Sequence, residues 1–171
     1  LGAEETLGYK VSMSGVTFSA SHAYATTGTE QSVTLVADGL VEGLAIGAGT
    51  GNNTNITTDD DVSTYFVTYA AGPITVGVQQ TKVDAETANT DIERDAYGIS
   101  FAVNENLSIS YGESETDWDA AAQVDEEDKG ISASYTAGGM TVGVVHNKAD
   151  NRNGAQDVDY EVTEIKLTFA F

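Results

Sequence analysis

The sequence predicts an all-β chain of short antiparallel strands, on the basis of three observations. Apolar and polar residues alternate along most of the chain, and a strand places successive side chains on opposite faces. Short segments rich in Gly and Asn separate the alternating stretches. The chain also ends on such an alternation, YEVTEIKLTFAF, in which Ile165, Leu167, Phe169 and Phe171 share one parity. A soluble domain usually ends in a polar, frayed tail, so this ending indicates a different setting.

The alternation predicts eleven strands in order along the chain. The first two form a hairpin through Ser14 and Gly15, and the third and fourth form a weaker pair joined around 38–43. Pro73 lies in a turn, where its missing N–H does no harm. The expected strands are 5–13, 16–24, 32–37, 44–49, 62–70, one from 74, 95–103, one from 107, 129–136, 140–148 and 160–171.

Most of these strands carry a clear apolar stripe, and the stripes are expected to point outward. Examples are Leu7, Tyr9, Val11 and Met13; Tyr65, Val67 and Tyr69; Ile74, Val76 and Val78; and Tyr97, Ile99, Phe101 and Val103. Several aromatic residues lie near strand ends, as an interfacial girdle requires: Tyr9, Tyr24, Tyr69, Tyr135, Tyr160, Phe169 and Phe171.

An internal repeat supports the division into hairpins. The segment YAAGPITVGVQQTK at 69–82 aligns with YTAGGMTVGVVHNK at 135–148, an offset of 66 residues, and the turn at Asn104 lies midway. One unit of two strands, a short turn and a longer loop therefore spans 33 residues. A propeller blade is longer, at about 40–45 residues.

The lengths of the connections predict how the strands are arranged. Short connections are expected near 14, 38, 71, 104 and 137, in strict alternation with long polar ones at 26–31, 50–61, 83–94, 116–128 and 149–158. Soluble Greek-key sandwiches do not follow this rule, whereas transmembrane barrels do. Nine residues at about 3.3 Å each, tilted by about 45°, rise about 21 Å, which matches most of an apolar band about 25 Å tall. The sequence therefore predicts an antiparallel transmembrane β-barrel.

The second parity of the strands predicts a wide, wet interior. Gly, Ser and Thr dominate there, and such side chains cannot fill a core but suit barrels of about 16 strands that leave an aqueous channel. Lys10 and Lys166 share this parity and are candidates for setting ion preference, the alternative being that they are simply solvated wall residues. The expected pore-lining residues are Lys10, Lys166, Glu164, Ser108, Ser110, Ser132 and Ser134.

Composition excludes several classes of partner. The chain has 171 residues, with 27 acidic and 7 basic side chains and a formal charge of −20, so neither nucleic acid nor an anionic membrane surface is an expected partner. It has no Cys, and no apolar run approaches the roughly 20 residues of a spanning helix. The sequence contains neither an initial Met nor a signal peptide, and Leu1 is interpreted as a processed or truncated start.

The alternating hairpins, acidic loops, Ala-Gly turns and final Phe-Ala-Phe resemble the C-terminal two-thirds of a Gram-negative general diffusion porin, most similar to the trimeric porins of alpha-proteobacteria. The resemblance extends over the whole chain, although only the terminal strand is a motif. It implies a barrel of about 16 strands, of which the single domain 1–171 would supply the sixth to the last. The constriction loop and most of the trimer contact would then lie upstream of Leu1.

The same resemblance implies partners and an assembly signal. It implies a homotrimer in the bacterial outer membrane, in contact with lipid and lipopolysaccharide, that passes ions and small hydrophilic solutes and requires no cofactor. The membrane assembly signal would be the terminal alternation of Ile165, Leu167, Phe169 and Phe171.

Two acidic runs are candidate calcium sites. They are Asp59, Asp60 and Asp61, and Asp125, Glu126, Glu127 and Asp128. Carboxylates are the hard oxygen ligands that Ca²⁺ prefers. Neither run has the spacing of a known calcium loop, so the alternative is a plain solvated acidic loop. Divalent ions that bridge these carboxylates, or link them to lipid phosphate, would relieve their repulsion.

Few residues suggest catalysis. His22 and His146 lie on the apolar parity near strand ends, and no spacing predicts a hydroxyl or carboxylate beside either one. Trp118 is expected to pin an acidic loop to the barrel, with carbohydrate stacking as the alternative. The sequence contains no phosphate loop or nucleophile elbow, so no enzyme is expected.

The sequence thus favours a passive, water-filled channel for ions and small hydrophilic solutes. Most of the negative charge is expected in loops at the outer mouth, which predicts a modest preference for cations. Two alternatives stay open: an acidic, calcium-binding surface adhesin, and a plugged, substrate-specific outer-membrane transporter. An adhesin should not end on Phe, and a transporter would need a plug.

Overall fold

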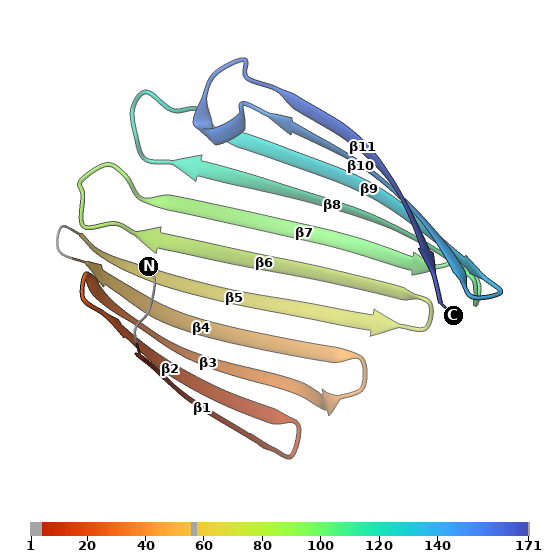
Figure 1. Ribbon diagram of the computed structural model, residues 1–171, viewed down its shortest axis with the longest axis horizontal. Helices are drawn as coiled ribbons and strands as arrows, with labels where there is room; N and C mark the ends of the chain where they lie inside the picture. Colours follow the sequence, from red (N-terminus) through yellow and green to blue (C-terminus); the bar gives the residue numbers. More distant parts are fainter. Residues whose placement is uncertain (1–4, 56–57, 171) are drawn as a thin grey trace.

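The fold is one continuous antiparallel sheet. The computed structural model describes residues 5–55 and 58–170, and within them eleven strands lie side by side in sequence order (Figure 1). The prediction of an all-β antiparallel fold is confirmed. Among the described residues β1 and β11 each pair with one strand, so they form the two edges. The strands are β1 (Glu5–Met13), β2 (Val16–Ala25), β3 (Gly28–Val41), β4 (Leu44–Asn55), β5 (Asp59–Ala71), β6 (Ile74–Asp84), β7 (Ile92–Ala102), β8 (Leu107–Trp118), β9 (Glu126–Ala137), β10 (Met140–Asp150) and β11 (Tyr160–Phe169).

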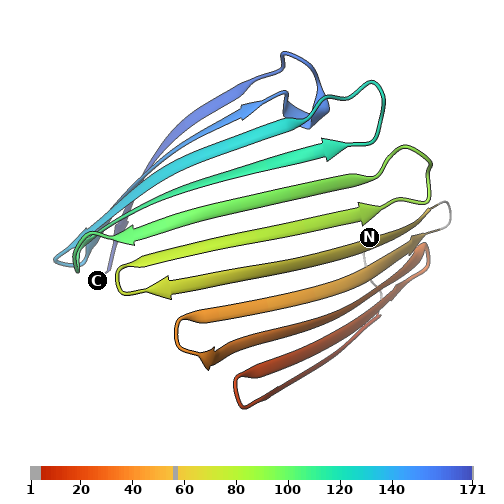
Figure 2. The ribbon, with the colours of Figure 1, turned by 180° about the vertical axis from the view of Figure 1, so that it is seen from behind.

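The connections at the two ends of the sheet differ in length, but less regularly than the sequence predicts. The turns at 14–15, 42–43, 72–73, 103–106 and 138–139 lie at the end where β11 finishes (Figure 2). The opposite end carries the connections 26–27, 85–91, 119–125 and 151–159. The long loop expected at 26–31 is therefore wrong, because β3 begins at Gly28 and pairs with β2 across a two-residue connection. The long loop expected at 50–61 is wrong as well, because β4 continues to Asn55 and β5 begins at Asp59. The strict alternation of short and long connections fails at both places.

The strands continue through polar residues toward this second end. Strand pairing uses backbone N–H and C=O groups, so it does not require apolar side chains. The sequence predicts that the fourth strand ends at Gly49, yet β4 continues to Asn55. The fifth strand begins at Asp59, with Asn52 opposite Asp61. The ladder therefore runs past the apolar stripes into a zone of polar and charged side chains.

Positive φ angles set the geometry of the tight hairpins. Ser14 and Gly15 have φ angles of 50° and 80°, and Gly138 and Gly139 have φ angles of 58° and 82°. A two-residue turn with positive φ at both positions matches the right-handed twist of the strands that it joins. Gly is the residue best suited to these positions because it has no Cβ to clash.

The two faces of the sheet differ in chemistry across its width. Ile99 and its direct partner Tyr111 lie on the face that we call the outer face, whereas the adjacent pair Ser100 and Ser110 lies on the inner face. Ala149, 8% exposed, is the only buried apolar side chain among the described residues. By contrast, Ile99 is 45% exposed, and most large apolar side chains of the outer face are exposed to a similar or greater extent. The described part of the protein therefore has no hydrophobic core of its own.

The sheet curls toward its inner face. Along β5 the inner positions 60, 62, 64, 66 and 68 are half-buried, while the outer positions from 59 to 69 are exposed. Phe66 is the large inner side chain in this region, and its ring lies where a Cβ on the opposite residue, Gly47, would have to be. Gly47 thus provides the space that accommodates Phe66.

Glycines also line up across the inner face. Gly77, Gly98, Gly112 and Gly130 are direct cross-strand partners in β6, β7, β8 and β9. A glycine inside a strand usually weakens the sheet, and it often marks a place where something approaches the backbone closely. This row leaves the middle of the inner wall without side chains.

Helical structure in the described ranges is limited to η1 (Arg152–Gly154), a single 3-10 turn between β10 and β11. None of the described residues belongs to a helix long and apolar enough to cross a membrane. Asn151 and Asn153 have left-handed φ angles of 56° and 58°, which fold this connection back on itself.

The contact between Phe66 and Gly47 predicts a specific packing defect. Gly47→Ala should displace the Phe66 ring and destabilise the folded protein by about 1–3 kcal/mol, the usual cost of overpacking. The urea midpoint of unfolding measures the effect. Gly8→Ala is the matched control, because a Cβ at this inner-face glycine meets nothing within 4 Å. Equal midpoints for the Gly47 and Gly8 variants would contradict the prediction.

Candidate functional site

The expected pore-lining residues lie on the inner face. Ser108 and Ser110 of β8 pair directly with Ser134 and Ser132 of β9, and the hydroxyls of Ser110 and Ser132 are 2.7 Å apart. At the two edges Lys10 stands opposite Ser19, Glu164 opposite Val145 and Lys166 opposite Gly143, all on the same face. The structure thus places all seven residues on one surface, and their role in lining a pore stays a prediction.

Cross-strand hydroxyl pairs give the inner face its polar character. Besides Ser110 and Ser132, hydroxyl oxygens lie 2.8 to 3.0 Å apart in the pairs Ser12–Thr17, Ser21–Ser32, Thr64–Thr81 and Thr136–Thr141. A hydroxyl both donates and accepts hydrogen bonds, so these pairs can also bond to water. The inner face is therefore wettable over most of its width.

The first acidic run divides between the two faces. Asp59 and Asp61 lie on the outer face, where the Asn52 side-chain amide donates to both, at 2.6 and 2.9 Å. The Thr54 hydroxyl also donates to Asp59, at 2.9 Å. Asp60 lies on the inner face and accepts a bond from the Glu86 backbone N–H at 3.3 Å. The structure brings Asp59 and Asp61 together but not Asp60.

The second acidic run divides in the same way. Glu126 and Asp128 lie on the inner face, and Glu127 lies on the outer face beside Lys129. The Arg94 guanidinium donates to Asp128 at 3.0 Å and to the Ser114 hydroxyl at 2.8 Å. Neither run is therefore a compact set of ligands, and calcium binding by them stays a prediction.

A different carboxylate cluster forms at the loop end of β8. Glu115 and Asp117 converge with Asp125, and an oxygen from each lies within 4.8 Å of the others. Sequence reasoning named Asp125 but missed the other two. The alternation of acidic residues at 113, 115 and 117 was the available signal, since it predicts three carboxylates on one strand face.

Charge is distributed unequally between the two faces. The acidic belt, as we call it, is the outer-face set beyond the apolar stripe: Glu5, Asp59, Asp61, Asp84, Glu93, Asp95, Glu113, Glu115, Asp117, Glu127, Asp150 and Glu161, interspersed with Lys82, Lys129 and Lys148. The inner face of the strands carries fewer charges, chiefly Glu30, Asp60, Glu126, Asp128 and Glu164 against Lys10, Arg94 and Lys166. The expectation that most acidic residues lie in loops is therefore wrong, because the extended ladders place many of them in strands.

The histidines and Trp118 are partly as expected. His22 and His146 are on the outer face, but His146 has polar partners that the sequence did not predict. Its Nδ1 is 2.9 Å from the Thr163 hydroxyl, and its Nε2 is 3.7 Å from the Glu161 carboxylate. Trp118 ends β8, and its indole N–H is buried without a hydrogen-bond partner among the described residues.

The arrangement resembles that of solved porins. The anion-selective porin of Comamonas acidovorans superposes with a TM-score of 0.80 at 15% identity, over 99% of this chain and 60% of that one. A loop-deletion mutant of the Vibrio cholerae outer-membrane protein OmpT gives a TM-score of 0.71 at 17% identity, over 98% of this chain and 63% of that one. The NanC porin gives a TM-score of 0.61 at 10% identity, over 97% of this chain and 92% of that one. The sequence matches no family profile and no curated protein.

These likenesses establish a class of fold, which is the consecutively paired antiparallel sheet of outer-membrane porins. At identities of 10–17% they say nothing further about this chain. The chain spans 60% of the length of the Comamonas porin.

The carboxylates at the loop end of β8 give a test of calcium binding. If Ca²⁺ occupies them, it should raise the urea midpoint of the native protein, and Asp117→Asn should remove most of that increase by taking away one ligand. Asp84→Asn is the control, because its carboxylate pairs with Lys82 at 3.3 Å instead of joining the cluster. A calcium response that is unchanged in the Asp117 variant would show that the cluster does not bind the ion.

Proposed function

We propose that this chain forms part of the wall of a passive, water-filled channel in a bacterial outer membrane. Ions and small hydrophilic solutes pass through this channel. The single observation that carries the proposal is that the described part of the sheet has no hydrophobic core on either side. Its apolar outer face stays exposed, and its inner face is rich in Gly, Ser and Thr. Such a sheet is stable when one face contacts lipid and the other contacts water.

The shape of the apolar region supports a lipid contact. Apolar side chains occupy the outer face from the short turns up to Tyr65, Tyr97 and Tyr111, and polar or charged residues follow immediately beyond them. Tyr rings favour the boundary between hydrocarbon and water because they have one apolar and one polar end. The acidic belt would then lie at the level of lipid headgroups, where divalent ions could link it to phosphate.

We also propose that this sheet is one part of a larger closed barrel of about 16 strands, assembled as a homotrimer. The superposition on the Comamonas porin supports a larger sheet, because the eleven strands match only 60% of that chain. The terminal residues Ile165, Leu167 and Phe169, all on the outer face, would serve in membrane assembly. Phe171, the last member of that signal, lies outside the described residues.

A modest preference for cations belongs to the same proposal. The inner face of the strands carries more carboxylates than basic groups, and a negative vestibule enriches counter-ions. Because much of the acidic charge points away from the inner face, the preference should be weak and should decline further as salt screens the remaining charge.

Single-channel recording of the full-length protein in a planar bilayer under a KCl gradient tests the channel. The expected record has large, stable steps, in groups of three for a trimer, and a reversal potential that favours K⁺ slightly. A reversal potential favouring Cl⁻ would overturn the cation preference. Absence of conductance from folded, inserted protein would overturn the open channel and favour a plugged transporter.

A pair of adjacent residues tests which face meets lipid. Ile99→Lys on the outer face should destabilise the protein in lipid vesicles by about 2–4 kcal/mol, the cost of Lys near the bilayer midplane. Ser100→Lys points inward and should cost little, since its ammonium stays in water. Urea unfolding in vesicles measures both. Similar losses for the two variants would argue against a lipid-facing outer surface.

A further inference from the structure

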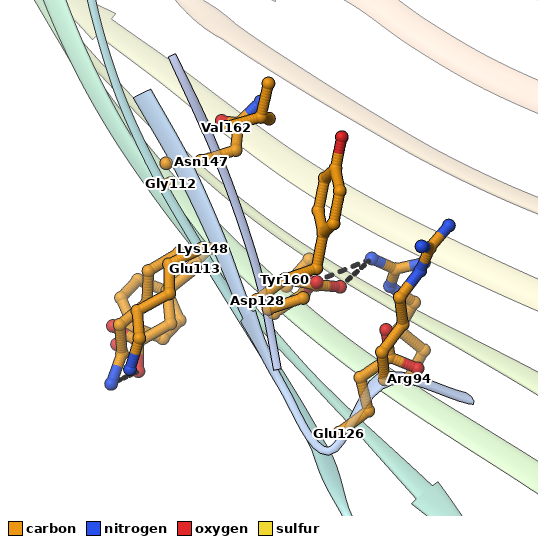
Figure 3. A pocket seen from close by; sticks show the side chains of 16 residues that line it. Arg94, Gly112, Glu113, Glu126, Asp128, Asn147, Lys148, Tyr160 and Val162 are labelled. Carbon is orange, nitrogen blue, oxygen red and sulfur yellow. Dashed lines mark hydrogen bonds and ion pairs between the residues drawn. The ribbon is translucent and has the colours of Figure 1, made fainter. Parts of the chain in front are cut away.

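A hollow on the inner wall, near the long connections, has the features of a binding site. It has a volume of about 490 Å³, and its inner-face lining comes from β7 to β11 together with η1. Figure 3 shows Arg94, Asp128 and Tyr160 on one side of the strands and Glu113 and Lys148 on the other. The volume lies in the range of small-molecule sites, which is about 300–1,000 Å³.

The glycine row keeps the floor of this hollow open. Gly112 and Gly130 are direct partners and contribute no side chains to the wall. A Cβ on Gly112 would meet one atom within 4 Å, the carbonyl oxygen of Tyr97 at 3.7 Å, so the space above it is free. Asn147 lies against Gly130 and presents its amide at the edge of the floor.

A braced connection holds Arg152 over the hollow. The Arg152 backbone N–H donates to the Val158 carbonyl at 2.7 Å, and the Asn151 side chain donates to the Asp125 carbonyl at 3.0 Å. Gly154 is buried against Gln123 of the neighbouring connection, and its carbonyl accepts from Val124 at 3.0 Å. The 151–159 connection is thus fixed to the 119–125 connection.

Tyr160 helps to position the guanidinium itself. The Arg152 guanidinium carbon lies 4.9 Å from the centre of the Tyr160 ring, a cation–π contact. Tyr160 is the first residue of β11, and it points to the inner face rather than joining the outer aromatic girdle that the sequence favoured. Ring stacking leaves the N–H groups at the edge of the guanidinium available to a ligand.

The two carboxylates on the inner side of the hollow already accept hydrogen bonds. Asp128 accepts from Arg94, and the Glu126 carboxylate accepts from the Asn153 backbone N–H at 2.9 Å. No carboxylate in the described ranges lies within ion-pair distance of Arg152. In a chain with a formal charge of −20, the hollow thus contains a guanidinium that has no ionic partner.

We infer that this hollow binds the carboxylate group of small organic anions, with the Arg152 guanidinium as the principal donor. The planar guanidinium matches a carboxylate with two parallel N–H bonds. The Asn147 amide and the carboxylate oxygens of Asp128 and Glu126 can bond to hydroxyl groups on the rest of the ligand. The inference rests on the proposed channel only for the route by which a solute reaches the site.

Calorimetric titration of the full-length protein, refolded in detergent at low ionic strength, tests this inference with gluconate as the probe. Gluconate should bind saturably, and Arg152→Gln should weaken binding about tenfold or more by removing a charged, bidentate donor. Arg152→Lys keeps the positive charge but cannot donate two parallel N–H bonds, so its gluconate affinity should lie between those of the native protein and Arg152→Gln. Lys82→Gln removes the same charge from the outer face and should bind as the native protein does.

Other results would overturn the inference. They are native-like binding by Arg152→Gln, equal weakening in Lys82→Gln, or equally tight binding of neutral glucose. Gluconate binding is measured in detergent and does not depend on a membrane current. If the protein binds gluconate but does not conduct, the proposed channel is wrong. If it conducts normally but does not bind gluconate saturably, the inferred site is wrong.

Discussion

The structure depends on the hydrogen bonds between neighbouring strands of one eleven-stranded sheet. These bonds satisfy backbone N–H and C=O groups between strands, but they cover neither face of the sheet. Backbone pairing fixes the alternation of side chains, so every residue must suit one of two surroundings. Ile99 and Ser100 are adjacent in the chain and require opposite solvents. The described residues accordingly form no hydrophobic core, and they leave the apolar face of the sheet uncovered.

The extension of the strands past the apolar stripe has a second effect, which concerns charge. Because the ladders of β7 and β8 continue to Ile92 and Trp118, the acidic side chains there keep the strict alternation of a strand. Glu93, Asp95 and Glu115 are consequently aimed outward, into the acidic belt, instead of surrounding the mouth. Much of the charge therefore acts on the surroundings of the sheet, and the inner wall is closer to neutral than the composition indicates.

The two braced connections after β8 and β10 produce the most specific chemistry of the inner wall. Contacts of Asn151 with Asp125, and of Gly154 with Gln123, bring together segments about thirty residues apart. They place a guanidinium without an ionic partner beside a floor of glycines. A site with a defined cation can thus exist within a strongly acidic protein, because local pairing decides which charges remain available to a ligand.

The sequence by itself determined the strand class, the order of strands and the face on which most strand side chains lie, because a period of two is a local property of the chain. Lys10 and Ser132 could be assigned to one surface for this reason. Only the tertiary structure decided where strands end, which carboxylates converge and which charges are paired. These depend on register and on contacts between distant connections, which local pattern does not encode: Glu115 meets Asp125 through the β8–β9 pairing, and Arg152 reaches Tyr160 through a left-handed turn at Asn151.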